Sequence, residues 1–502
     1  MSNAPILIIG AGPTGLNLAL RLARSGTAFC IIDEHDGPAQ ESRALAVHAR
    51  TLEFYHQLGL ADAIVDAGTR IGGIRMYRDG RARGHIKLGD IGAGLSPYPF
   101  ILDFPQDEHE RLLVDRLRDM GIEVERRTAL ASFTQDPDGA DAVLIKDGQR
   151  SHVRASYICG CDGARSKVRE GIGASFSGGT YQHLYYVADV RLETPDTGND
   201  FHIATGTDTF ALRLPARKGQ NERLIGFAPD GIEHPVFEDV RADAEHLLDI
   251  RVAEVNWFST YRVHHRVAGR FRKGRAFLLG DAGHLHSPVG GQGMNTGIGD
   301  AVNLAWKLAA VVGGRAAEAL LDTYEAERIP FARSLVATTD RVFQTVVSDG
   351  VDGHVLRSLV LPTLIPAAMH VGAARKAMFR LASQIAIHYP ESSLSVGRAG
   401  DVAGGDRLPW VGSIDNHAPL ISLDWQLHVY GDVAPAITAS AQHLGLALHR
   451  FDWSAAVGKA GMERGSGYLV RPDGHIALAM SAPTAAALED YAKMRGLVFV
   501  SE

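Results

Sequence analysis

Pro5-Ile6-Leu7-Ile8-Ile9-Gly10-Ala11-Gly12-Pro13-Thr14-Gly15 is the stretch that decides the fold. A short apolar run leads directly into a G-x-G-x-x-G turn. Apolar residues then recur at helical spacing from Leu16 to Ala23, and a second apolar run, Ala28 to Ile32, ends at Asp33. The order strand, turn, helix, strand predicts the beginning of a parallel, doubly wound α/β sheet.

The spacing of the glycines predicts a dinucleotide site. Gly10 permits the tight turn, Gly12 lets the backbone approach a pyrophosphate, and Gly15 lets the helix pack closely on the strand. The phosphates would then meet the free N–H groups of a helix N-terminus. Asp33, at the end of the second strand, can accept hydrogen bonds from the hydroxyls of a ribose. The pattern predicts a dinucleotide without specifying which one.

Composition narrows the class of protein. The chain has 502 residues, enough for two to four domains, with 45% apolar and 22% charged residues, as in ordinary globular proteins. The net charge of −7 argues against nucleic acid or an anionic membrane as a partner. Three cysteines (Cys30, Cys159, Cys161) cannot form a disulfide framework, and neither a signal peptide nor a membrane span is apparent. We therefore expect a cytoplasmic protein.

Two later stretches also end a strand in a glycine-containing turn. Tyr157 to Gly160 leads into Asp162-Gly163, and Phe277 to Leu279 leads into Gly280-Asp281. A glycine-rich loop from Pro288 through Gly291 to Asn295 then enters a long helix. Residues without side chains let a flat ring lie against the backbone, and N–H groups at the start of a helix stabilise negative charge on that ring.

The rest of the chain predicts two further layers. Strands rich in β-branched and aromatic residues between Gly173 and Val267, interrupted by a helix near Ala242 to Val252, predict an antiparallel sheet. From about Asp401 the expected order is β-α-β-α-β-β-α, the thioredoxin-like arrangement, with Arg471-Pro472-Asp473-Gly474 as a hairpin turn. The expected strands are Leu420 to Tyr430, Leu446 to Phe451, Gly467 to Val470 and Ile476 to Met480. This last part contains no cysteine, so it cannot carry dithiol chemistry.

The predicted fold class is α/β, with three domains. A Rossmann-like dinucleotide-binding domain with middle helices would comprise residues 1–174 and 268–390. An antiparallel β-sheet domain for the substrate would comprise residues 175–267, and a thioredoxin-like domain residues 401–502.

Taken together, the three glycine-containing turns resemble the FAD-binding fingerprints of single-component (group A) flavin monooxygenases, the aromatic hydroxylase family. The third fingerprint extends from Gly280-Asp281 to Asp300-Ala301, and lesser landmarks such as Ser42-Arg43-Ala44 and Pro105-Gln106 agree. The C-terminal domain is similar to that of the phenol hydroxylase and polyketide hydroxylase branch. The resemblance covers nearly the whole chain and implies that the Rossmann-like domain is an FAD-binding domain.

The resemblance implies a role for each matching residue. Asp33 would bind the adenosine ribose, Arg43 and Gln106 the phosphate or ribose region, Asp162 the phosphate channel, and Asp281 the pyrophosphate and ribityl chain. Pro288 would place its carbonyl near the isoalloxazine ring. The cofactor-binding residues that we expect are Gly10, Gly12, Gly15, Asp33, Arg43, Gln106, Asp162, Asp281, Gly291, Met294 and Asn295.

The resemblance also implies the reaction. NADPH or NADH would reduce FAD, O₂ would form a flavin C4a-hydroperoxide, and a phenolic or related aromatic substrate would be hydroxylated. The expected catalytic residues are His202, Arg213 and Pro288. An alternating strand could direct His202 and Arg213 toward the substrate; alternatively, His202 is structural and Arg213 forms a salt bridge with a neighbouring strand. We expect no metal, because no Cys, His and carboxylate set has zinc-like spacing.

Other functions compete with hydroxylation. A flavin halogenase would show W-x-W-x-I-P, whereas Trp257 is followed by Phe258-Ser259. A polyketide epoxidase or Baeyer–Villiger monooxygenase, and a non-catalytic flavin-containing binder, stay open. The expected partner is a small aromatic substrate, with neither nucleic acid nor membrane, and a homodimer is compatible with the sequence.

Overall fold

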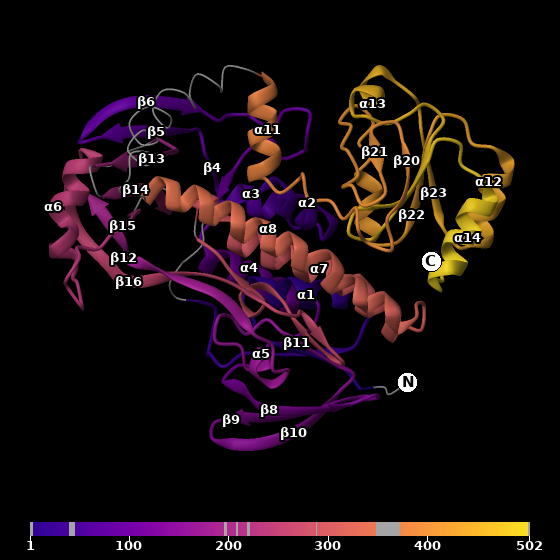
Figure 1. The fold of residues 1–502 in the computed structure, drawn as a ribbon, viewed down its shortest axis with the longest axis horizontal. Helices are drawn as coiled ribbons and strands as arrows, with labels where there is room; N and C mark the ends of the chain where they lie inside the picture. The colour runs from indigo at the N-terminus through magenta and orange to yellow at the C-terminus, as the bar shows by residue number, and fades with distance from the viewer. Residues whose placement is uncertain are drawn as a thin grey trace.

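A computed structural model of the chain describes residues 4–39, 46–194, 198–206, 209–217, 221–287, 289–347 and 372–499. Three bodies follow one another along its longest axis (Figure 1). An eight-stranded sheet forms one end, a parallel sheet with its helices lies in the middle, and a six-stranded C-terminal sheet forms the other end. Within these residues, no helix is long and apolar enough to cross a membrane.

The central sheet has five strands in the order β17-β18-β11-β1-β2. Its members are β1 (Ile6–Ile9), β2 (Phe29–Ile32), β11 (Tyr157–Gly160), β17 (Arg272–Lys273) and β18 (Ala276–Leu278). All pairings are parallel except that between β17 and β18. Every residue of β1, β11 and β18 is buried, as expected for strands covered on both faces. This confirms the predicted parallel α/β sheet.

Helices cover the central sheet. α1 (Pro13–Arg24) packs against both α4 (Gln106–Asp119) and α7 (Gln292–Val312). α1 begins at Pro13, which suits a first helical position because it needs no N–H partner there. The other helices of this part are α2 (Ala49–Gln57), α3 (Ala61–Ala67), α5 (Lys167–Gly171), α8 (Asp322–Val347) and α11 (Gly372–Ala382).

Two small three-stranded sheets complete the middle part. One consists of β8 (Thr128–Asp136), β9 (Gly139–Lys146) and β10 (Gln149–Ala155). The other has the order β3-β7-β4, with β3 (Ala46–Val47), β4 (Thr69–Arg70) and β7 (Leu102–Asp103). Through β3 and β4 the second sheet holds both ends of the α2–α3 segment against β7.

The eight-stranded sheet has the order β19-β16-β12-β15-β14-β13-β5-β6. Its antiparallel part confirms the predicted sheet: β12 (Phe176–Leu192), β13 (Asp200–Thr205), β14 (Phe210–Arg217), β15 (Asn221–Phe227) and β16 (Val252–Ala268). Three strands come from outside that region: β5 (Gly73–Arg78), β6 (Arg81–Lys87) and β19 (His284–Leu285). β5 pairs with β13 in parallel. Hairpin patterns in the sequence do not predict this pairing, because the two strands are far apart along the chain.

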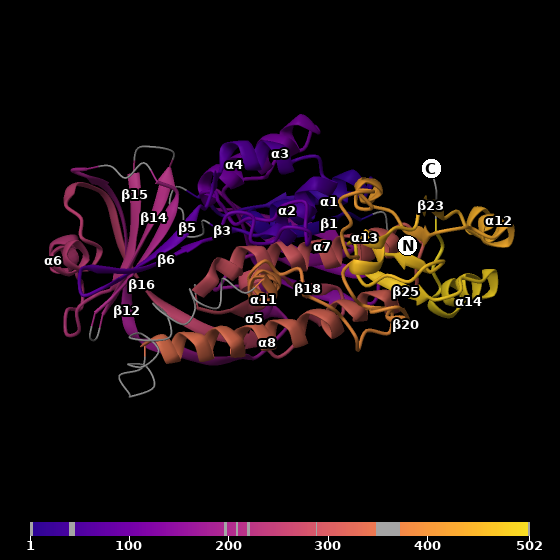
Figure 2. The same ribbon diagram turned by 90° about the horizontal axis from the view of Figure 1, so that it is seen from above.

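One helix, α6 (Phe237–Leu248), covers the outer face of this sheet, on the side turned away from α2 and α7 (Figure 2). It starts five residues before the predicted helix at Ala242. Ala204, Ala211 and Leu224 pack beneath α6 with Phe237 and Leu247. We call the side formed by these residues the α6 face and the other side the opposite face.

The C-terminal sheet has six strands in the order β21-β20-β25-β24-β22-β23. Its elements are β20 (Val396–Ala399), β21 (Val402–Ala403), β22 (Gln426–Tyr430), α12 (Pro435–His443), β23 (Ala447–Phe451), α13 (Ala455–Lys459), β24 (Gly467–Val470), β25 (Ile476–Met480) and α14 (Ala485–Arg495). From β22 onward the order is the predicted one, with Arg471–Gly474 as the turn. The prediction that the first strand begins at Leu420 is wrong, because residues Ala418–Ser422 form a 3₁₀ turn and Leu423 has φ of +61°.

Candidate active site

The carboxyl ends of four parallel strands meet at one edge of the central sheet. β1 pairs with both β2 and β11 in parallel, and β11 pairs with β18, so Ile9, Ile32, Gly160 and Leu278 end side by side. The segments that follow these strands contain the residues that the sequence singled out: Gly10, Gly12, Gly15, Asp33, Asp162 and Asp281. In open α/β sheets, ligands bind at this edge.

The glycine turn at this edge is tightly constructed and leaves one side open. Gly10 has φ of +99°, and a Cβ there would lie 2.3 Å from the carbonyl oxygen of Cys161. A Cβ on Gly15 would lie 2.0 Å from the carbonyl oxygen of Gly10. A Cβ on Gly12, the N-cap of α1, would meet nothing within 4 Å. The open space beside the N-terminus of α1 fits a pyrophosphate.

Asp33 ties the second strand to this turn. Its Oδ2 accepts a hydrogen bond from the Ala11 N–H at 2.6 Å, and its Oδ1 accepts one from the His35 N–H at 2.9 Å. A carboxylate has roughly four acceptor positions, so hydroxyls of a ribose could be accommodated as well. Its place at the strand end matches the expected ribose contact.

Asp162 has one carboxylate oxygen that the protein uses and one that it does not. Its Oδ2 accepts hydrogen bonds from the N–H groups of Lys167 at 2.7 Å and Val168 at 3.2 Å, at the beginning of α5. Its Oδ1 is buried and has no hydrogen-bond partner among the described residues. Burial raises the pKa of Asp162 above its ordinary value. A buried acceptor of this kind suits a ligand that donates a hydrogen bond.

Gly280 holds the third turn against the first. It has φ of +59°, and a Cβ there would lie 2.8 Å from Oγ1 of Thr14 in the first turn of α1. A Cβ on Gly297 of α7 would lie 2.3 Å from the same oxygen. Only glycines therefore let α1, α7 and this turn approach so closely. Asp281 follows at the surface, on the side of the open strand edge.

Asp300 of α7 holds the Gly280-Asp281 turn in place through its carboxylate. Its Oδ2 accepts the Gly280 N–H at 2.9 Å and lies 2.8 Å from Nε2 of His284, and its Oδ1 lies 2.6 Å from Nε of Arg328. Burial would raise the pKa of Asp300, but Arg328 and His284 hold it below its usual value. Asp300 lies at the end of the third fingerprint, but no role was expected for it from the sequence. One feature of the sequence could have indicated a buried ionic contact: Asp300 and Lys307 are the charged residues of an otherwise uncharged α7.

The N-terminus of α7 carries the residues expected at the flavin ring. Gly291 is the N-cap, with φ of +61°, and a Cβ there would lie 2.6 Å from Cβ of Ala46. The first N–H groups of a helix, here up to Met294, have no intrahelical partner and are available to a ligand. The N–H of Met294 is therefore available to a ligand, whereas the N–H of Asn295 lies one position beyond this set.

The side chain of Asn295 has a different task, which the sequence did not indicate. Its Oδ1 accepts hydrogen bonds from the His48 N–H at 3.0 Å and from Thr51 Oγ1 at 2.7 Å. Its Nδ2 donates to the carbonyl oxygens of Ala46 and Gly291, both at 2.8 Å. Asn295 thus joins the helix start to β3 and α2.

Of the other expected cofactor residues, Gln106 begins α4, and its Nε2 donates to Oε1 of Glu110 at 2.8 Å. Glu110 in turn accepts the Ala39 N–H at 2.8 Å. Gln106 therefore belongs to a layer that packs on α1. Arg43 and Pro288 lie outside the described residues.

The structure places His202 and Arg213 on the α6 face. They precede Ala204 and follow Ala211 by two residues each, so strand alternation directs them toward α6. Nη2 of Arg213 lies 2.8 Å from Nε2 of His202, and Arg213 Nε forms an ion pair with Glu222 at 2.8 Å. The expectation that these side chains point toward the substrate is therefore corrected: Arg213 forms the salt bridge with a neighbouring strand that the sequence left open.

The opposite face is aromatic and lies toward the middle of the molecule. The rings of Tyr185, Phe210, Phe227 and Tyr261 form one cluster, with centroids of Phe210 and Phe227 4.5 Å apart. Arg223 points to this face and donates to both carboxylate oxygens of Asp189, at 2.8 and 2.7 Å. No group of three or more His, Cys, Asp or Glu residues suited to a metal ion occurs in the described part of the chain.

Comparison with known proteins identifies this architecture. The model of a family described as FAD binding domain matches residues 3–339. The chain belongs to this family.

Its relatives include 6-methylpretetramide 4-monooxygenase of Streptomyces rimosus, 39% identical over 80% of this chain and 72% of the relative. Another relative from that species, 12-dehydrotetracycline 5-monooxygenase/anhydrotetracycline 6-monooxygenase, is 30% identical over 94% of both chains. Among solved structures, anhydrotetracycline hydroxylase from Streptomyces rimosus superimposes with a TM-score of 0.78 at 28% identity, covering 98% of this chain and 99% of the other.

These relationships confirm the enzyme class predicted from the sequence. The protein is an FAD-dependent flavoprotein monooxygenase of the aromatic hydroxylase type, which uses O₂ and a reduced nicotinamide cofactor. The mixed α/β fold expected for such an enzyme is confirmed as well.

Proposed function

We propose that this monooxygenase hydroxylates a planar phenolic or related aromatic compound of polyketide type. One observation carries the proposal: β19 joins the eight-stranded sheet beside β16, and the chain runs from there into the glycine-rich N-terminus of α7. The sheet with the aromatic opposite face is therefore continuous with the segment expected to hold the flavin ring. The names of the relatives support the substrate class.

FAD would extend along the edge of the central sheet. Asp33 would accept hydrogen bonds from the adenosine ribose, and the open side of Gly12 would receive the pyrophosphate. Asp162 and Asp281 would lie beside the phosphates and the ribityl chain, where their carboxylates can accept hydrogen bonds from ribityl hydroxyls. The N-terminus of α7 would hold the flavin ring. The same reasoning keeps Arg43, Gln106 and Pro288 as proposed contacts. When bound, FAD accepts hydride from the nicotinamide cofactor and activates O₂ for transfer of one oxygen atom.

The protein's own residues would orient the substrate and exclude water. The rings of Tyr185, Phe210, Phe227 and Tyr261 provide an apolar floor for a flat substrate. Arg223, held by Asp189, provides a cation on the same face of the sheet. A cation near a phenol favours its more nucleophilic phenolate form, which is the form that an electrophilic oxygen attacks most readily.

We also propose the domain organisation. The FAD-binding domain would comprise residues 1–174 and 268–390 and the substrate domain residues 175–267, to which β5 and β6 contribute. Residues 401–502 would form a thioredoxin-like domain. The strand order β25-β24-β22-β23, with β22 parallel to β23 and antiparallel to β24, supports that comparison.

The test is a screen of planar polycyclic phenols and single-ring phenols with the FAD-loaded enzyme. A suitable compound should accelerate NADPH or NADH oxidation and gain one oxygen atom from ¹⁸O₂ on its aromatic ring. Product structure separates hydroxylation from epoxidation or Baeyer–Villiger insertion. If every compound yields only hydrogen peroxide, the proposed hydroxylation is contradicted.

A further inference from the structure

The hairpin turn of the C-terminal sheet enters a fully buried cluster of charges. Nη1 and Nη2 of Arg471 donate to Oε1 and Oε2 of Glu327 on α8, at 2.7 and 3.0 Å. Nη2 of Arg471 also donates to Oδ2 of Asp473 in the same turn, at 2.5 Å. The Arg471 and Glu327 side chains have no exposed surface. A two-pronged pair of this kind fixes both position and angle.

The next residue of α8 continues the chain of contacts toward the candidate FAD site. Nε of Arg328 donates to Oδ1 of Asp300 at 2.6 Å, and Nη1 of Arg328 donates to the hydroxyl of Tyr389 at 3.0 Å. Asp300 in turn accepts the N–H of Gly280 at 2.9 Å. Each of these side chains is buried.

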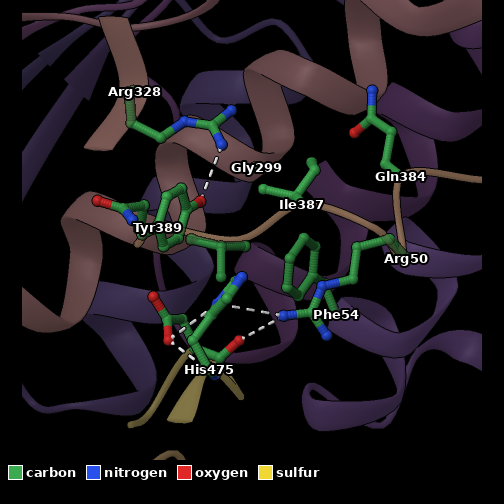
Figure 3. Close-up of a pocket in the computed structure, with 11 residues that line it drawn as sticks. Arg50, Phe54, Gly299, Arg328, Gln384, Ile387, Tyr389 and His475 are labelled. Carbon is green, nitrogen blue, oxygen red and sulfur yellow. Dashed lines mark hydrogen bonds and ion pairs between the residues drawn. The ribbon is translucent and has the colours of Figure 1, made fainter. Parts of the chain in front are cut away.

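A second set of contacts also connects the C-terminal hairpin turn with Arg328. The ring of His475, at the end of the hairpin turn, packs against the ring of Tyr389 with centroids 4.6 Å apart. Figure 3 shows Tyr389 between Arg328 and His475, with the Arg328 hydrogen bond drawn to its hydroxyl. The cavity around these residues is about 10 Å³, enough for one water molecule at most.

The residues of this buried network have little freedom to move relative to one another. Glu327 and Arg328 are consecutive residues of one helix, so they cannot shift independently of each other. A buried charge that loses its partner is strongly destabilised, which penalises any displacement of either end. The turn at Arg471 and the turn at Gly280 are therefore held in one relative position.

We propose that the C-terminal hairpin turn is a positioning element of the FAD site, acting through Glu327, Arg328 and Asp300 on the Gly280-Asp281 turn. This inference rests on the proposed role of Asp281 toward FAD. It adds a function for the C-terminal part of the chain, which lies beyond the matched family region of residues 3–339.

The experiment compares two matched variants. Tyr389→Phe removes the hydroxyl that Arg328 uses and keeps the ring. Tyr430→Phe removes a similarly buried hydroxyl, which accepts a hydrogen bond from Nδ2 of Asn416 at 2.7 Å in the C-terminal core. For Tyr389→Phe we expect the FAD dissociation constant to rise about fivefold, the lower end of typical coupling between sites. For Tyr430→Phe we expect it to stay the same. Both apoproteins are also compared by thermal unfolding.

A third variant places the origin of the effect in the hairpin turn. Arg471→Lys keeps the positive charge but loses the two-pronged contact with Glu327, so it should also weaken FAD binding about fivefold. The absorption bands of bound flavin should shift in Arg471→Lys and Tyr389→Phe alone, because the surroundings of the cofactor change.

Each outcome decides the proposal. Unchanged FAD affinity in Tyr389→Phe and Arg471→Lys overturns it, and so does an equal loss of affinity in Tyr430→Phe, which would indicate general weakening of the fold. A lower unfolding temperature without a change in FAD affinity or spectrum also overturns it. Failure of the wild-type protein to bind FAD would instead contradict the proposed FAD site.

Discussion

Among single residues, the three glycines of the first turn differ in what surrounds them. The space beside Gly12 is open to 4 Å, whereas a Cβ on Gly15 would lie 2.0 Å from a backbone oxygen. Gly12→Ala should therefore change the free energy of unfolding of the apoprotein by less than about 1 kcal/mol. It should weaken FAD binding at least tenfold, because the new methyl group occupies the proposed pyrophosphate position. Titration of apoprotein with FAD and urea unfolding measure the two quantities.

Gly15→Ala is the comparison for that prediction. Because its Cβ would collide with backbone, this variant should lose about 1–3 kcal/mol of unfolding free energy even without FAD. If Gly12→Ala binds FAD as tightly as the wild type, the pyrophosphate does not lie beside Gly12.

The sequence predicted individual residues well where a backbone rule applies. Gly10, Gly15, Asp33 and Asp162 follow from the geometry of a strand that ends in a turn, and the structure brings them to one edge. Asp300 was named only as part of a motif. Its contact with Gly280, and that of Arg328 with Asp300, depend on how α7 and α8 pack, which local sequence patterns do not contain.

At the level of elements, the two faces of the eight-stranded sheet should respond differently to the same substitution. Arg213→Met on the α6 face and Arg223→Met on the opposite face each break a buried ion pair, so each should lower the free energy of unfolding by roughly 3 kcal/mol. Only Arg223→Met should reduce kcat/KM for an accepted aromatic substrate, by about tenfold, the loss expected for a hydrogen bond to a charged group. A loss of kcat/KM in Arg213→Met alone would return the substrate to the α6 face.

The difference between the two faces explains why the sequence could suggest His202 and Arg213 as substrate contacts. Alternation says that His202 and Arg213 share a face with Ala204 and Ala211, but not which face a helix covers. The position of α6 decides that question. In the C-terminal sheet, by contrast, β24 and β25 were predicted residue for residue, because a clear turn, Arg471–Gly474, separates two short apolar runs.

For the whole molecule, buried histidines predict a steep loss of stability in acid. Burial lowers the pKa to about 4 for His48, His286 and His475 and to about 3 for His109 and His417. Between about pH 6.5 and pH 4 the unfolded chain binds protons that the folded chain does not, so stability falls as the pH falls. Each histidine contributes up to about 1.4 kcal/mol per pH unit in this window.

Urea unfolding of the apoprotein at pH 7.5, 6 and 5 measures this slope. His417→Gln provides the control: Nε2 of His417 lies 2.9 Å from the carbonyl oxygen of Leu408, a contact that a glutamine amide can replace. This variant should lose one histidine's share of the pH dependence. A flat profile between pH 7 and 5 would mean that these rings take up protons in the native state.

The parallel pairing of β5 with β13, and the antiparallel pairing of β19 with β16 at the other end of the sheet, matter for protein engineering. The substrate-facing part of this enzyme is not one contiguous piece of gene. A chimera that exchanges only residues 175–267 with a relative would leave a foreign edge against residues 73–87 at one side and residues 284–285 at the other. Any transplant of specificity between members of the family has to carry all three segments together.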